Sequence, residues 1–173
     1  KIAARLLQHG YISEAMHANV ESLISTTTDP QEASKGVQLV SESIPENIAL
    51  KQKVWAEFDK YLPADAILTT NTSTLIASMF AEASGRPERF LAWHFHLPTL
   101  TANVVDVMPH PGTDPAITQV VFEHSKNVGQ IPIDINVEWP NYVYNEMLTS
   151  LTGAALRLAV NDVASVENID RAW

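Results

Sequence analysis

The sequence contains no cysteine among its 173 residues. This absence excludes disulfide bonds, iron–sulfur clusters, thiolate zinc sites and a cysteine nucleophile. The sequence also has no apolar run near the ~20 residues that a helix needs to cross a bilayer, so no membrane partner is expected. Any metal site would have to use carboxylates and the six histidines.

Basic residues are scarce. The chain has 11 Lys and Arg against 20 Asp and Glu, which gives a formal net charge of -9 at pH 7. A chain of this charge repels polyanions, so we expect no nucleic-acid partner. The 46% hydrophobic and 18% charged residues are typical of globular proteins. The length predicts one domain, or one domain with part of a second.

The two ends of the sequence predict a fragment of a longer protein. The chain begins at Lys1 inside a helical pattern, without an initiator Met, and it closes at Trp173 inside another helical pattern. The first residues lack the basic leader, apolar core and cleavage site of a signal peptide. A cytoplasmic location is therefore expected.

Short apolar runs alternate with longer amphipathic segments along most of the chain. The apolar runs predict strands at 23–27, 37–43, 66–70, 90–95, 103–108 and 131–135. The amphipathic segments predict two helices around Gly10, the second capped by Ser13, and further helices at 30–35, 46–61, 75–83 and 115–128. Beyond Tyr142 the pattern is only helical, so we expect one domain at 1–138 and the start of another at 139–173.

Strands separated by helices of about a dozen residues predict an α/β fold with a largely parallel sheet covered on both faces. Ligands of such sheets bind beyond the carboxyl ends of the strands. The polar residues that follow predicted strands are therefore the candidates for a functional site. They are Glu46, the run 71–73 and the run 94–96.

Several of these stretches together resemble the 3-hydroxyacyl-CoA dehydrogenase family. The matching strings are SESIPENIALK at 41–51, NTST at 71–74, GRPERF at 85–90 and HF at 94–95. Further matches are HPGTDP at 110–115, the stretch 140–145 and ENIDRA at 167–172. Their order and spacing agree with the family from about Ser22 to the last residue.

The resemblance implies the NAD-dependent oxidation of a 3-hydroxyacyl-CoA to a 3-oxoacyl-CoA, a reaction of fatty acid metabolism. It also implies a Rossmann-like, doubly wound NAD-binding domain, followed by an all-α domain that usually forms a homodimer. The family's Gly-rich phosphate loop follows its first strand, whereas this chain has six glycines and no G-x-G. We therefore expect the chain to start downstream of that loop and to lack the pyrophosphate site.

The resemblance implies a catalytic pair formed by His94 and Asp106. His94 matches the family's general base, and Asp106 stands twelve residues later, where the family has a glutamate that orients the histidine. A carboxylate on the far ring nitrogen fixes the tautomer and stabilises the imidazolium. Asp is one methylene shorter, so either the backbone compensates or the enzyme is slow. The residues alone also fit a hydrogen-bonded histidine and a solvated aspartate without chemistry.

Four further residues match functional positions of the family. Ser73 matches a serine that touches substrate and nicotinamide, and Asn145 matches an asparagine that helps to hold the substrate carbonyl. Glu46 and Lys51 match a Glu and a Lys on the NAD side of the family's site. The structural alternatives are a helix cap for Ser73 and two solvated charges for Glu46 and Lys51.

Four departures from the family pattern bear on the predicted function. His96 forms an H-x-H pair with His94, but no third ligand is placed by the sequence, so we expect no metal. Leu97 stands where an asparagine commonly contacts the cofactor, and leucine has no hydrogen-bonding side chain. Glu146 reverses the charge of an arginine and thereby favours a different or smaller acyl substrate, and Asn141 replaces a glycine.

The preferred hypothesis is a 3-hydroxyacyl-CoA dehydrogenase-like oxidoreductase that uses NAD. One alternative is a dehydrogenase of a smaller 3-hydroxy acid without CoA. Another is a catalytically weak relative kept as a binding or structural protein. The large aromatic residues favour packing over a cofactor site: Trp55, Phe58, Trp93, Trp139 and Tyr142.

Overall fold

The computed structural model describes residues 2–99 and 102–173, and its elements follow an α/β order. The strands are β1 (Leu39–Glu42), β2 (Ile67–Thr70), β3 (Phe90–Phe95), β4 (Val104–Pro109) and β5 (Ile131–Asp134). The α-helices are α1 (Ile2–Gln8), α2 (Glu14–Val20), α3 (Pro30–Ala33), α4 (Ile48–Phe58), α5 (Pro115–Asn127), α6 (Tyr144–Val160) and α7 (Val166–Asp170). Short 3-10 turns lie at Glu21–Leu23, Ala77–Met79, Glu82–Ser84 and Pro87–Arg89.

The five strands form one sheet in the order β1-β2-β3-β4-β5. Three of the four pairings are parallel, and β3 pairs with β4 antiparallel. The expected mostly parallel sheet is thus confirmed. The connection between β3 and β4 is only eight residues long, which is too short for the crossover that a parallel pair requires.

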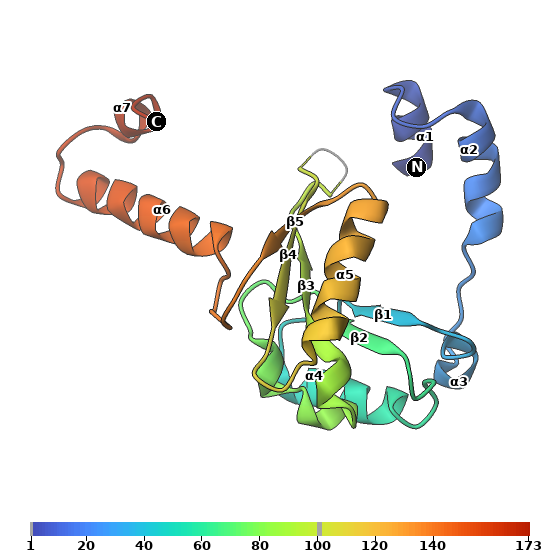
Figure 1. The fold of residues 1–173 in the computed structure, drawn as a ribbon. Coiled ribbons are helices and arrows are strands. Elements are labelled where there is room, and N and C mark those ends of the chain that lie inside the picture. The colour runs from blue at the N-terminus through green and yellow to red at the C-terminus, as the bar shows by residue number, and fades with distance from the viewer. Residues whose placement is uncertain (1, 100–101) are drawn as a thin grey trace.

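Both faces of the sheet are covered, as the sequence predicts for a doubly wound fold (Figure 1). On one face, Trp55 of α4 packs in a buried cluster with Leu68, Phe90 and Met108. The opposite face carries alternate residues of the same strands, and they pack against one side of α5. This second cluster contains Ile67, Leu91, Trp93, Val105, Val107, Ile117 and Val121.

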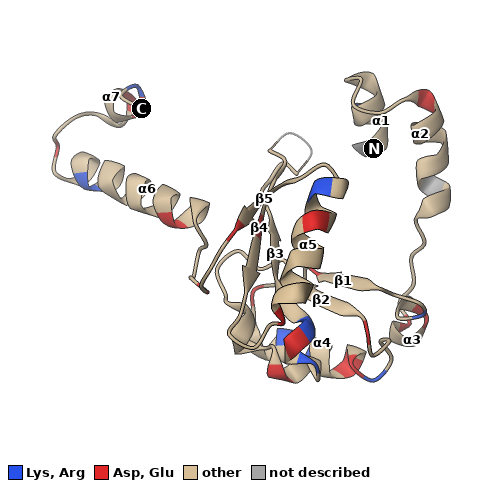
Figure 2. Ribbon diagram, in the orientation of Figure 1, with Lys and Arg blue, Asp and Glu red and all other residues tan. Residues whose placement is uncertain are grey.

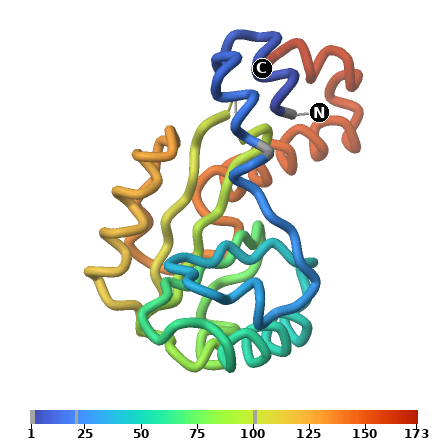
Figure 3. The backbone as a smooth tube through the Cα atoms, turned by 90° about the vertical axis from the view of Figure 1, so that its right-hand side faces the viewer, coloured from blue at the N-terminus to red at the C-terminus, as the bar shows by residue number. Residues whose placement is uncertain are grey.

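The helices at the two ends of the chain extend away from the sheet. Figures 1 and 3 show α1 and α2 as one arm and α6 and α7 as another. No helix within the described ranges is long and apolar enough to span a membrane. Acidic positions occur on both arms and around the sheet, for example Glu14, Glu57 and Glu146 (Figure 2).

The predicted strand at 23–27 is wrong. Leu23 and Ile24 are 81% and 66% exposed, and residues 24–27 have no regular structure. A strand is stabilised by pairing and by burial of one face, and this segment has neither. Its polar groups serve the next turn instead, because the Thr27 hydroxyl donates to Glu32 and accepts from the backbone N–H of Asp29.

The predicted helix at 75–83 is also wrong, because two 3-10 turns replace it. Side chains from distant parts of the chain form hydrogen bonds with backbone groups that a continuous helix would pair internally. The N–H of Ser78 donates to Glu138, and the carbonyl of Met79 accepts from Gln52. Phe80 is buried in the core between these turns, so packing overrides local helix propensity.

Capping residues predicted where helices begin better than helix propensity predicted where helices form. The Ser13 hydroxyl accepts from the N–H of Met16 at the start of α2, and the Asp114 carboxylate caps α5 by accepting from the N–H of Ala116. The predicted helix at 46–61 is shorter in the structure, since α4 begins after the Asn47 cap and ends at Phe58.

Candidate active site

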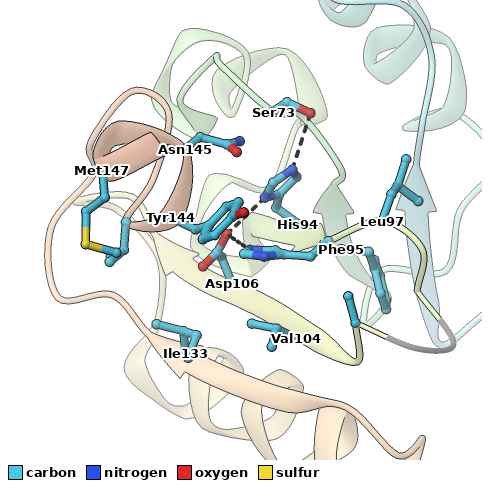
Figure 4. Close-up of a pocket in the computed structure, with 13 residues that line it drawn as sticks. Ser73, His94, Phe95, Leu97, Val104, Asp106, Ile133, Tyr144, Asn145 and Met147 are labelled. Atoms are coloured by element: carbon cyan, nitrogen blue, oxygen red, sulfur yellow. Dashed lines mark hydrogen bonds and ion pairs between the residues drawn. The ribbon is translucent and has the colours of Figure 1, made fainter. Parts of the chain in front are cut away.

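The candidate residues meet at one edge of the sheet. β1, β2 and β3 run parallel, so their carboxyl ends lie together, and Glu46, Ser73 and His94 lie after or at these ends. Because β4 runs antiparallel to β3, its first residues lie beside the last residues of β3, and this brings Asp106 to the same edge. Figure 4 shows Ser73, His94 and Asp106 of this cluster.

His94 and Asp106 are direct cross-strand partners in the β3–β4 ladder. His94 Nδ1 lies 2.9 Å from Asp106 Oδ2, and His94 Nε2 lies 3.3 Å from the Ser73 hydroxyl. Both members of the pair are buried, whereas Ser73 is exposed. The short aspartate therefore reaches the histidine, because opposite residues of an antiparallel pair start only about 5 Å apart at Cβ.

His96 shares the same carboxylate oxygen. Its Nε2 also lies 2.9 Å from Asp106 Oδ2, and the two histidine rings lie 5.4 Å apart. Asp106 Oδ1, by contrast, is buried and has no hydrogen-bond partner in the described part of the chain. Asp106 thus joins two imidazoles through one oxygen and leaves the other oxygen unsatisfied.

A cavity of about 570 Å³ opens beside this cluster (Figure 4). One side is formed by the ends of β3 and β4, and the other by the beginning of α6. Asn145, which the family resemblance singles out, lines the cavity together with Tyr144 and Met147. The other lining residues are Ser73, 94–97, Ala102, Val104, Asp106, Ile133 and Val143.

Tyr142 stacks on the catalytic candidate His94, with ring centroids 4.7 Å apart and an interplanar angle of 26°. Tyr142 is buried in the core cluster, in agreement with its expected packing role. Asn141 and Tyr142 both have positive φ, at 66° and 58°. Asn141 stands where the family has glycine, and asparagine tolerates this conformation better than most residues.

Burial raises the pKa of the Tyr142 phenol, and the nearby charges of Asp106 and Glu46 raise it further. The phenol therefore stays neutral at physiological pH. Its hydroxyl finds no hydrogen-bond partner among the residues that the structure describes. Tyr142 thus supplies a flat neutral surface behind His94 rather than a proton donor in a chain.

Lys51 lies inside the protein and not at a surface. Its ammonium is fully buried and donates to both oxygens of Glu42, at 2.8 and 3.0 Å, and to the Ile44 carbonyl at 3.2 Å. Glu42 also accepts from the Thr70 hydroxyl. The alternative of a solvated charge is wrong for Lys51, because its ammonium is buried and forms an internal ion pair with Glu42.

Glu46 lies at the rim of the site, with its side chain 39% exposed. Its carboxylate accepts from the Thr72 hydroxyl at 2.7 and 2.6 Å and from the backbone N–H of Ser73. Lys51 Nζ lies 3.9 Å from it. Glu46 therefore fixes the loop that carries Ser73, while Thr72 and not Ser73 bonds the N–H of Leu75.

The departures from the family pattern also have structural positions. Leu97 is 84% exposed and lines the cavity, so it offers an apolar surface where the family has an amide. Asn141 and Glu146, which replace the family's glycine and arginine, contact each other at 3.4 Å. These two replacements therefore form one local unit.

Sequence reasoning missed two features of this site. The Glu42 partner of Lys51 comes from the end of β1, and no spacing rule links residues nine apart on a strand and a helix. The second bond of Asp106, to His96, was within reach of the sequence. The strand register that pairs residue 94 with 106 also puts residue 96 on the same face, one pleat away.

Comparisons with known proteins identify the family of the chain. The family model of the 3-hydroxyacyl-CoA dehydrogenase NAD-binding domain matches residues 1–138. The chain belongs to the 3-hydroxyacyl-CoA dehydrogenase family. The matched segment is part of an NAD-binding domain, which agrees with the cofactor expected from the sequence, and the Rossmann-like fold is confirmed.

Individual known proteins match over nearly the whole chain. A 3-hydroxybutyryl-CoA dehydrogenase from Clostridioides difficile is 31% identical over 172 residues, which are 99% of this chain and 60% of that protein. A solved diketoreductase, described in a study of dual catalysis of dicarbonyl compounds, has a TM-score of 0.94 at 32% identity and covers 99% of this chain and 61% of that one.

A second solved structure is the (S)-3-hydroxybutyryl-CoA dehydrogenase from Ralstonia eutropha. Its TM-score is 0.88 at 25% identity, with 95% of this chain and 58% of that chain covered. The chain therefore spans less than two thirds of the length of each of these three relatives.

Proposed function

We propose that the protein oxidises a 3-hydroxyacyl-CoA to the 3-oxoacyl-CoA with NAD as hydride acceptor. The observation that carries the proposal is the hydrogen-bonded line from Asp106 through His94 to Ser73 at the wall of the cavity. A buried base with one nitrogen fixed and the other facing a cavity is what oxidation of a secondary alcohol requires. The family membership supports the same reaction class.

His94 is the proton acceptor in this proposal. Its Nδ1–H donates to Asp106, which leaves the lone pair of Nε2 free to take the hydroxyl proton of the substrate. Asp106 then stabilises the imidazolium that forms. The stacked face of Tyr142 restricts rotation of the ring, so the histidine keeps its orientation toward the cavity.

Ser73 and Asn145 approach the cavity from two different elements. Ser73 follows β2 and lies 3.3 Å from His94 Nε2, so its hydroxyl can bond the same oxygen that loses its proton. Asn145 lies in the first turn of α6 and lines the opposite side of the cavity. In the proposal its amide holds the carbonyl oxygen of the thioester.

NAD, when bound, supplies the acceptor for the hydride that leaves the substrate carbon. The polar groups at the carboxyl ends of β1 and β2 fit its nicotinamide end, because Ser73 is exposed there and Glu46 holds its loop. Lys51 acts as a positioning residue, since its buried ammonium lies 3.9 Å from Glu46. Leu97 removes one polar contact that the family uses for the cofactor.

The acyl-CoA substrate and the homodimer are parts of the same proposal. Exposed apolar side chains on α6, among them Leu151, Leu156 and Leu158, support self-association of the intact protein. Light scattering of the purified protein tests that state. A monomer at the concentration of the activity assay would contradict it.

The test of the activity is NADH formation at 340 nm by the intact protein with 3-hydroxybutyryl-CoA and, separately, free 3-hydroxybutyrate. His94→Ala and the isosteric His94→Gln should lower kcat by about 10²–10⁴-fold, the usual contribution of a general base. His124→Gln is the matched control, because His124 lies on α5 and contacts Trp93 on the far face of the sheet.

Each outcome separates the hypotheses. Turnover of the thioester that is lost in both His94 variants and kept in His124→Gln supports the proposal. Turnover of the free acid alone would replace it with a dehydrogenase of a smaller 3-hydroxy acid. Turnover that survives in both folded His94 variants would overturn the assigned base.

A further inference from the structure

His94, His96 and Asp106 together form a set of metal-ligand side chains. One ligand atom of each lies within 4.8 Å of those of the others. The sequence supplied only the H-x-H pair on β3, and the fold adds the carboxylate across the ladder on β4. Two imidazoles and one carboxylate are a donor set that zinc-class ions use, with a further position open to water or substrate.

The distances between the three groups are near the spacing that a bound ion requires. His94 Nδ1 and His96 Nε2 each lie 2.9 Å from Asp106 Oδ2. Ligand atoms about 2.1 Å from a tetrahedral ion are about 3.4 Å from one another. The two distances to Oδ2 would have to lengthen by about 0.5 Å, and one nitrogen of each ring, at present within 4.8 Å of the other, would have to come to about 3.4 Å from it.

An unsatisfied atom at the same place is a second observation in favour of a cation. Asp106 is 1% exposed, and its Oδ1 has no hydrogen-bond partner within the described residues. A buried carboxylate oxygen without a partner is costly, and a cation that binds the carboxylate through both of its oxygens would satisfy it. All three side chains line the cavity of about 570 Å³, so an ion can reach them from solvent.

We propose that His94, His96 and Asp106 bind one divalent transition-metal ion of the zinc class, with the open coordination position facing the cavity. The ion would bind the lone pairs of His94 Nδ1 and His96 Nε2, the two nitrogens that face Asp106. The relevant ligands are all within the chain, so binding needs no second protein.

Metal binding and base catalysis exclude each other at His94. An ion on Nδ1 forces the proton of the neutral ring onto Nε2, beside Ser73. The proposed function needs the opposite tautomer, with Nε2 free to accept the proton of the substrate. The ion is therefore a reversible inhibitor, and this consequence, unlike the binding itself, rests on the proposed function.

The binding test uses the intact protein after treatment with a chelator and dialysis. We expect calorimetric titration with ZnCl₂ to give one ion per chain, and Co²⁺ to give the visible absorption of a four-coordinate site. His96→Gln keeps a hydrogen-bond donor for Asp106 but removes an imidazole, and it should weaken binding more than about 100-fold. His124→Gln, on the far face of the sheet, should bind as the wild type does.

Turnover measured with and without Zn²⁺ then tests inhibition, each variant being compared with its own metal-free rate. Zinc should inhibit the wild type and His124→Gln, with recovery on addition of chelator, and should inhibit His96→Gln at least tenfold less. Equal zinc affinity in wild type and folded His96→Gln, or no saturable binding, would overturn the metal site. Binding without any turnover would retain the site and reject the proposed function instead.

Discussion

Under the proposed function, lengthening the carboxylate side chain of Asp106 is expected to slow turnover, although Glu is the residue that the family has at this position. Asp106 already reaches His94 at 2.9 Å, because the two residues face each other directly across the β3–β4 ladder. Asp106→Glu adds one methylene to a side chain that is 1% exposed. The carboxylate must then move by about 1.5 Å, the length of one carbon–carbon bond.

The size of the effect follows from this displacement. A misplacement of about 1 Å costs on the order of 10²-fold in rate, or about 2.7 kcal/mol of barrier. The extra methylene also has to fit among buried side chains at the wall of the cavity, and overpacking of this kind costs about 1–3 kcal/mol of the free energy of unfolding. We therefore expect kcat to fall about 100-fold in Asp106→Glu, with a clearly lower Tm and little change in KM.

The assay is NADH formation by the intact protein with 3-hydroxybutyryl-CoA, beside thermal unfolding of each variant. Asp106→Asn serves as the reference, because it keeps the shape of the side chain and removes its charge. Its kcat should fall further, on the order of 10⁴-fold. A kcat of Asp106→Glu equal to or above the wild type would refute the reasoning, since it would show that the short carboxylate limits the rate.

Three further predictions concern the surroundings of the site. Lys51→Met leaves the buried Glu42 carboxylate without its partner and should lower the free energy of unfolding by about 3–5 kcal/mol in urea titrations, with partial recovery when Glu42→Gln is added. Asn141 has a φ of 66°, so Asn141→Ala should cost about 1–2 kcal/mol and Asn141→Gly should cost little, as measured by Tm. Tyr142→Phe removes a hydroxyl that has no partner in the described structure, and burial raises the pKa of this hydroxyl. We therefore expect Tyr142→Phe to lower neither the Tm nor the turnover rate at alkaline pH.

Much of the sheet could be predicted from the sequence, because its signals are local. The strands at 90–95 and 103–108 are apolar runs bounded by polar residues, and the Asp114 cap with Pro115 marks the start of α5. The strand predicted at 23–27 failed because apolar residues alone do not supply a pairing partner. The helix predicted at 75–83 failed because distant side chains bond its backbone.

The candidate site was predictable only in part, because residues that are distant in the sequence form it. The positions His94, Asp106 and Ser73 came from family resemblance, and the fold brings them together. The internal ion pair of Lys51 depends on how α4 packs behind the sheet, which no short-range pattern encodes. The sequence also allowed a solvated surface position for Lys51, and packing excludes it.

The antiparallel pairing of β3 and β4 explains how Asp106 and His96, two departures from the family pattern, fit into the site. Because the strands reverse direction, Asp106 faces His94 directly, and a short side chain is sufficient for the bond. The same short side chain keeps its carboxylate between the strands, where His96, two residues along β3 on the same face, can also donate to it. A longer carboxylate would extend past this shared position. The aspartate and the second histidine are therefore linked, since the short side chain leaves one carboxylate oxygen within hydrogen-bond distance of both rings.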